Sequence, residues 1–158
     1  MSAMAADQLY KVAYDEAVRA LSEQQAVIDS FHTRAGLLLS SAAITTSFLG
    51  AQALHGGKPG SFAWLALTGF VIVATAFLTI LWPRRWEFTV NPHDVIRTYI
   101  ESAEPATIEE LHWELSIHMN GSYLENSKGL RKLVVFLQVA NVLLVVEVVL
   151  WIVAIASA

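Results

Sequence analysis

Three long apolar segments dominate the pattern of hydrophobic and polar positions along the chain. They cover residues 35–54, 62–82 and 133–158, and Glu147 in the third segment is the only charged residue among them. A helix of about 20 residues crosses a hydrocarbon core roughly 30 Å thick, and each segment reaches this length. The pattern therefore predicts an all-α integral membrane protein with three transmembrane helices, the first two forming a hairpin over residues 35–82.

The segment of residues 1–34, which is more polar than the three apolar segments, has the pattern of an amphipathic helix. Apolar side chains recur from Leu9 onward every three or four positions, which is the period of one helix face. Neither glycine nor proline occurs between Ala3 and Ala35, so we expect this helix to continue into the first span. Its polar face is acidic and would be repelled by anionic headgroups, so we expect it to pack against neighbouring helices.

A second polar segment, residues 83–132, is predicted to be mainly helical. Pro83 ends the second span, and residues 86–90 read as extended chain. Asn91 followed by proline is typical of a helix N-cap and first turn, which predicts a short helix through Ile100.

A second helix is predicted within the same segment, beginning at a capping box. Thr107 and Glu110 have the spacing at which each side chain satisfies a free backbone N–H near the other. Gly121 and Gly129 are expected to weaken this helix before the third span, with a bend as the simplest result. The turn-forming run 56–60 predicts a tight link between the first two spans.

Basic residues give the predicted orientation. Residues 1–34 and 83–132 contain nine Lys and Arg residues, whereas the hairpin tip contains only Lys58. Because basic loops stay on the cytoplasmic side, we expect a multi-pass protein of the cell membrane with its N-terminus inside and its C-terminus outside. Aromatic residues expected at the two interfaces agree: Trp82, Trp86 and Phe88 at one, Trp64 and Trp151 at the other.

Composition narrows the function classes. Of the 158 residues, 55% are hydrophobic and 15% charged, and the net charge is −4, which argues against an ordinary soluble enzyme and a nucleic-acid partner. Cysteine is absent, which excludes thiolate chemistry. The sequence also has no phosphate loop and no motif of a nucleophilic or zinc hydrolase. We expect a lipid bilayer as partner, no cofactor and no catalytic residue.

Small residues line one face of the first span. Glycine, serine and alanine recur at a 4-3-4-3 spacing at Gly36, Ser40, Ala43, Ser47 and Gly50. Such a stripe permits close backbone approach between helices in lipid. The sequence favours the second span as partner, through Ala66, Gly69 and Ala76, and leaves open the first span of another copy.

Glu147 is the most informative intramembrane residue. A carboxylate near the middle of a span costs about 2.5 kcal/mol or more, so such residues are functional by default. Two interpretations remain open. Glu147 can gate or conduct ions, or it can be a protonated structural residue bonded to Ser40, Thr45 or Ser47, or to another subunit.

Two further polar residues of the third span lie on a different helix side from Glu147. Ala140 and Ala154 share the face of Glu147, whereas Gln138 and Asn141 do not. The third span is therefore predicted to contact two neighbours, with Gln138 and Asn141 as further gating candidates.

Glu110, Glu114 and His118 share one helix face and have side chains that can bind a metal ion. A solvated charged face gives the same spacing and is the favoured interpretation. His93, Asp94 and His112 are interpreted as loop or surface residues, so no metal ligand is assigned.

The order of parts resembles the small bacterial membrane effectors of cyclic-nucleotide antiphage defence, the Pycsar transmembrane effectors and the related SLATT domains. The residues that carry the resemblance run through most of the chain: Gln24, Ile28, Asp29, Arg34-Ala35, Pro83-Arg84, Tyr99, Glu110-Leu111, Glu114-Leu115 and Asn126-Ser127-Lys128. Arg34 stands where the family pattern has lysine.

The resemblance implies a homo-oligomer in the bacterial inner membrane that senses a nucleotide signal, or binds a cytoplasmic partner, and forms or regulates a membrane lesion or pore. It supplies no ligand residue. Two other functions stay open: a scaffolding subunit that binds a separate protein, and a small ion or proton transporter that uses Glu147.

Overall fold

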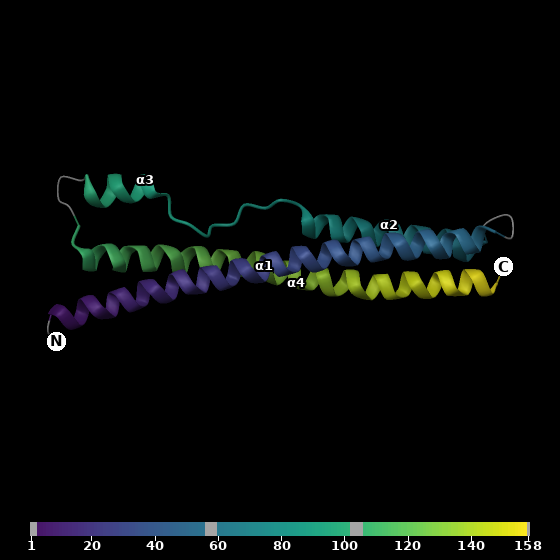
Figure 1. Cartoon of the computed structure of the whole chain (residues 1–158), viewed down its shortest axis with the longest axis horizontal. Coiled ribbons are helices and arrows are strands. Elements are labelled where there is room, and N and C mark those ends of the chain that lie inside the picture. The colour runs from purple at the N-terminus through teal and green to yellow at the C-terminus, as the bar shows by residue number, and fades with distance from the viewer. Residues whose placement is uncertain (1–2, 56–59, 102–105, 158) are drawn as a thin grey trace. The chain divides into compact units, whose positions relative to one another are not determined.

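The computed structural model describes residues 3–55, 60–101 and 106–157, and these are helical apart from short connections (Figure 1). The helices are α1 (Ala3–Leu54), α2 (Ser61–Leu81), α3 (Pro92–Val95), the π-helical turn η1 (Ile96–Ile100) and α4 (Ile108–Ala156). Three of them, α1, α2 and α4, are long and apolar enough to cross a membrane. The all-α prediction is confirmed, and the expected tight link at 56–59 lies outside the described residues.

The helix is continuous at two places where a polar segment of the sequence meets an apolar segment. α1 runs without a break from the amphipathic segment into the first apolar segment, as expected from the lack of glycine and proline before Gly36. α4 likewise continues through Gly121 and Gly129 into the third apolar segment. α4 is therefore unbroken at both glycines, although the sequence predicted a weaker helix there.

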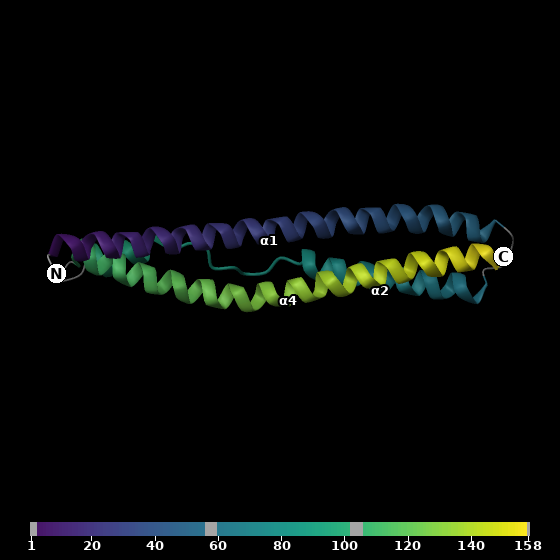
Figure 2. The ribbon, with the colours of Figure 1, turned by 90° about the horizontal axis from the view of Figure 1, so that it is seen from below.

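The chain divides into two compact units. Unit 1 comprises residues 1–28 and 84–130, and unit 2 comprises residues 29–83 and 131–158. α1 and α4 therefore contribute residues to both units. In unit 2, α2 lies alongside the second half of α1 and of α4, as two perpendicular views agree (Figures 1 and 2).

Alanines bring the helices of unit 2 together. Ala53, Ala63, Ala66 and Ala154 form a buried cluster around Trp151. Small side chains let the backbones approach closely, which increases dispersion contact between helices. Further buried apolar side chains extend this core along α2 and α4: Val73, Phe77, Ile80, Leu133 and Leu137.

Local signals set the helix ends. Trp82 is extended, with φ −62° and ψ 128°, because the ring of Pro83 disfavours a helical residue before it. The Asn91 side chain accepts a hydrogen bond from the His93 N–H at 3.1 Å and Pro92 occupies the first turn. These observations confirm the predicted helix end and the predicted N-cap.

The capping box of α4 is also confirmed. The Glu110 carboxylate accepts from the Thr107 N–H at 2.8 Å, and the Thr107 hydroxyl oxygen accepts from the Glu110 N–H at 3.3 Å. The backbone N–H of Thr107, followed by its hydroxyl, lowers the pKa of the Glu110 carboxyl below its ordinary value, because both donors favour the ionised form.

Candidate functional site

Glu147 of α4 is the centre of the candidate site in unit 2. Its side chain is 1% exposed. Oxygen Oε1 accepts two hydrogen bonds, one from the Thr46 hydroxyl of α1 and one from the Trp151 indole N–H at 3.0 Å. Oxygen Oε2 is also buried and has no hydrogen-bond partner among the described residues. Within the part of the chain that the structure describes, the carboxyl group is therefore held by one oxygen, and the other is a buried polar atom without a partner.

Glycines allow the close packing around this group. A Cβ atom added to Gly69 of α2 would lie 3.6 Å from Cγ of Glu147, in ordinary van der Waals contact. A Cβ added to Gly50 of α1 would lie 3.3 Å from Cη2 of Trp151. Gly50 thus provides the space that the Trp151 ring occupies, and α2 covers the stem of Glu147.

Glu147 is buried, but its predicted partners within the chain, Ser40, Thr45 and Ser47, are wrong. A partner in another subunit stays a prediction. The donor is Thr46, which lies on the face of α1 that also buries Ala35, Ala42 and Ala53. Each residue advances a helix by about 100°, so a one-residue error in phase selects a different side chain. Ser40 instead returns its hydroxyl to the Gly36 carbonyl at 2.9 Å.

The predicted small-residue stripe is only partly an internal packing surface. Gly50 packs against Trp151, but Ser40 and Ser47 are exposed, and no described residue lies within 4 Å of a Cβ added to Gly36. Ala43 is half-buried. The internal face of α1 is rotated from the stripe, so most of the stripe faces away from the rest of unit 2.

The predicted division of α4 into two polar sides is confirmed. Ala140 and Ala154 are buried on the side of Glu147. Gln138 and Asn141 are both exposed. Their amide groups therefore lie on an outer face of a helix that is apolar enough to cross a membrane.

Unit 1 contains a polar network that the sequence did not predict. Asn126 of α4 bonds to the backbone of Glu87 in both directions, from Nδ2 to the carbonyl at 2.9 Å and from the N–H to Oδ1 at 3.3 Å. The Ser122 hydroxyl donates to the Glu87 carboxylate at 3.4 Å. The network attaches the extended chain after α2 to the first half of α4.

Gln24 links α1 to α4 within unit 1. Its Nε2 donates to the Tyr123 carbonyl at 3.1 Å and to the Ser127 hydroxyl at 3.0 Å. Gln24, Asn126 and Ser127 are among the residues that carry the family resemblance, and all three hold helices or chain segments together here. Gln24 is a polar residue on the packed face of an amphipathic helix, and this position is the sequence signal that could have identified it as a contact between helices.

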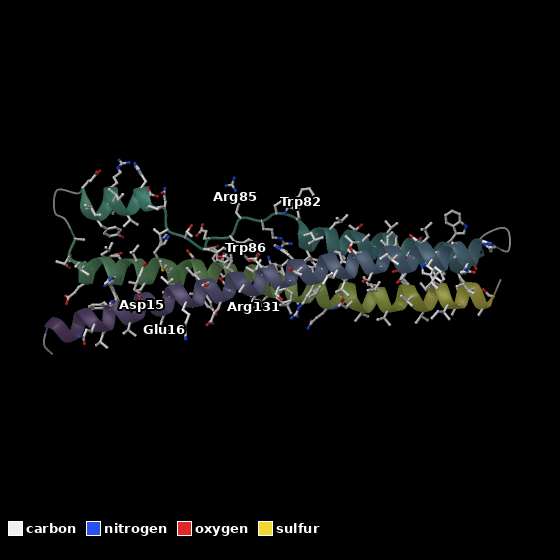
Figure 3. All side chains as sticks on the ribbon, in the orientation of Figure 1. Asp15, Glu16, Trp82, Arg85, Trp86 and Arg131 are labelled. Atoms are coloured by element: carbon white, nitrogen blue, oxygen red, sulfur yellow. The ribbon has the colours of Figure 1, made fainter. Side chains whose placement is uncertain are left out.

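Trp86 and Gly129 form a further contact in unit 1 that was not predicted. A Cβ added to Gly129 would lie 2.9 Å from two atoms of the Trp86 ring. Figure 3 shows Trp86 directed toward α4 and Arg85 directed away from it. Gly129 is therefore required by close approach of an indole ring, and the predicted bend does not explain it.

The metal site considered for Glu110, Glu114 and His118 is not formed. Among the described residues, no group of three potential ligands is placed so that it could hold a metal ion. Glu110 serves the capping box, whereas Glu114 and His118 border a cavity of about 330 Å³ together with Asp94. His93 is exposed, as predicted, but His112 is half-buried on α4, 5.4 Å from the Tyr14 ring.

Comparisons with protein-family models, with curated proteins and with solved structures find no match to this chain.

Proposed function

We propose that the chain is a self-associating, multi-pass protein of the bacterial inner membrane, and that its assembled spans form or regulate a lesion or pore. Unit 2 is the membrane part and unit 1 is the cytoplasmic part. The proposal assigns no catalytic activity to the protein. The signal is a cyclic nucleotide, as the family resemblance implies, or a cytoplasmic partner protein.

The observation that carries this proposal is the outward position of Gln138 and Asn141 on α4. A primary amide that faces hydrocarbon lacks the hydrogen bonds that water would give it, and this costs free energy. A second copy of the chain supplies partners of the same kind, because side-chain amides hydrogen-bond across helices in membranes. The exposed small face of α1 at Ser40 offers close approach for the same assembly.

The connection between signal and membrane follows from helix continuity. α1 and α4 each pass from unit 1 into unit 2 without a break in the helix. A ligand that favours one packing of Gln24 against the α4 backbone in unit 1 shifts the population of that packing. The same two helices carry Thr46 and Glu147, which are joined by a hydrogen bond. The proposed response in the membrane is that these two side chains leave this bond and take other partners.

Dye leakage from liposomes tests this function. Purified protein is reconstituted with and without added cyclic nucleotides, and its mass in detergent gives the number of subunits. We expect an oligomer and leakage that depends on the signal. A monomer with intact liposomes in every condition would remove the pore proposal, and a foreign protein at fixed stoichiometry would favour a scaffold.

A second candidate function is ion or proton transport through Glu147. The supporting observation is oxygen Oε2, which is buried in unit 2 and has no hydrogen-bond partner in residues 3–55, 60–101 and 106–157, since a carboxyl oxygen in this position can accept a proton or a cation. Glu147→Gln separates the candidates. Lost flux with unchanged oligomer size favours transport, whereas a changed oligomer size favours a packing role.

A further inference from the structure

A cavity of about 430 Å³ lies in unit 2, between α1 and α2 and beside the Trp151 ring of α4. Small-molecule sites in proteins have volumes of about 300–1,000 Å³, so this cavity is large enough for a ligand. Gly50, Ala63 and Leu67 form much of its wall, and none of its described wall residues is charged. The contact between Gly50 and the Trp151 ring fixes one side of the cavity.

Two of the hydrogen-bond donors in the wall are already in use. The Thr46 hydroxyl and the Trp151 indole N–H both donate to Glu147, and each of these side chains has only one polar hydrogen. An occupant therefore meets the methyl group of Thr46 and the ring of Trp151. The other donors of the wall are the Ser47 hydroxyl and the Trp64 indole N–H, and no described wall residue is charged. This chemistry favours a flexible apolar group over a charged ligand.

The cavity opens toward the surroundings of unit 2. Trp64 and Leu67 on its α2 wall are 60% and 41% exposed. Water is a poor occupant, because an ordered water needs two to four polar partners. An empty apolar space also loses the dispersion contacts of its lining. Both arguments favour an apolar occupant that enters from outside.

We propose that this cavity binds one acyl chain of a bilayer lipid. The inference rests on the proposed function, because it requires α1, α2 and α4 to be inserted in a membrane. Trp64, which is 60% exposed, is predicted to lie at a membrane interface, where indole rings are enriched, so the cavity is expected to lie where the acyl chains meet the headgroups. The bound chain packs against the same two donors that hold Glu147, which places a lipid beside the carboxyl group.

Native mass spectrometry of the protein in detergent tests the proposal. Ala51→Trp fills the cavity from an exposed wall position of α1, and Leu67→Trp does so from α2. Ala156→Trp, on an exposed position of α4 outside the cavity, is the matched control. We expect bound phospholipid with the wild type and the control, and loss of that phospholipid with both cavity variants at unchanged helix content by circular dichroism.

Each outcome has a separate meaning. Equal lipid retention by a folded cavity variant and the wild type would overturn the acyl-chain site. Lipid loss together with a changed oligomer size would assign the cavity to an interface between copies, which also overturns it. If the wild type leaves cell membranes without detergent, the proposed membrane function fails first. If Ala51→Trp does not fold, Leu67→Trp decides the outcome.

Discussion

The Thr46 hydroxyl of α1 donates a hydrogen bond to the buried carboxyl group of Glu147, 101 positions along the chain. This bond joins α1 and α4 through Glu147, the one charged residue of the three apolar segments 35–54, 62–82 and 133–158. Whether the carboxyl group serves packing, gating or transport, its position depends on Thr46 and on the neighbouring Trp151.

Thr46→Val should destabilise the protein by about 1 kcal/mol, because hydrogen bonds between helices in membranes contribute roughly this amount. Valine keeps the shape of threonine and removes the donor. Thr45→Val is the matched control on the adjacent, half-buried position and should change stability by less than about 0.5 kcal/mol. The free energy of unfolding in mixed micelles measures both. Equal effects of the two variants would contradict the assigned pair.

Gly129→Ala should destabilise unit 1 by about 1–3 kcal/mol, the usual cost of overpacking. The added methyl group would lie 2.9 Å from the Trp86 ring. Gly121→Ala serves as control, because none of the residues that the structure describes lies within 4 Å of a Cβ at that position, and it should stabilise α4 by about 0.5–1 kcal/mol. The midpoint temperature of thermal unfolding should fall for Gly129→Ala and rise for Gly121→Ala. A shift of the same sign would refute the Trp86 contact.

Acid should loosen the first turn of α4. Hydrogen bonds from Thr107 lower the pKa of Glu110 below its ordinary 4.5. The stabilisation is therefore present above about pH 4.5 and is lost as the pH falls through the lower pKa of the folded state. Hydrogen exchange of the Thr107 amide should accelerate over this range, after correction for intrinsic rates. Glu110→Gln should abolish the pH dependence and Glu109→Gln should retain it.

Asn141→Leu should weaken self-association. An amide pair across helices in a membrane contributes about 1–2 kcal/mol, so the dissociation constant of the oligomer should rise about tenfold. Val142→Leu, on the next exposed position of α4, is the control and should leave the constant unchanged. Energy transfer between labelled copies in liposomes measures it. Unchanged association of Asn141→Leu would mean that the exposed amide does not contact a second copy.

Local sequence patterns predict most of the fold. The uninterrupted stretch before Gly36, the proline after Trp82, the Asn91 cap and the Thr107 capping box each involve residues within a few positions of one another. These signals are local, so composition and spacing reveal them. The boundaries of unit 1 and unit 2 depend on contacts between distant segments, which the same signals do not contain.

Pairing between helices was harder to predict. Choosing Thr46 over Thr45 or Ser47 requires the rotational phase of α1 against α4, and a difference of one residue rotates the side chain by about 100°. The contacts of Trp86 with Gly129, and of Asn126 with Glu87, join segments about 40 positions apart. A polar or glycine residue marks such positions in the sequence, but only the packed structure identifies its partner.

Labelling of introduced cysteines tests the central claim, membrane insertion with unit 1 inside the cell, most directly. The chain has no cysteine, so Ser157→Cys and Glu23→Cys each supply a single thiol at an exposed position. With a membrane-impermeant maleimide on intact spheroplasts, we predict labelling of Ser157→Cys at once and of Glu23→Cys only after lysis. Labelling of Ser157→Cys only after lysis would contradict the predicted orientation, and recovery of the protein in the soluble fraction would contradict insertion itself.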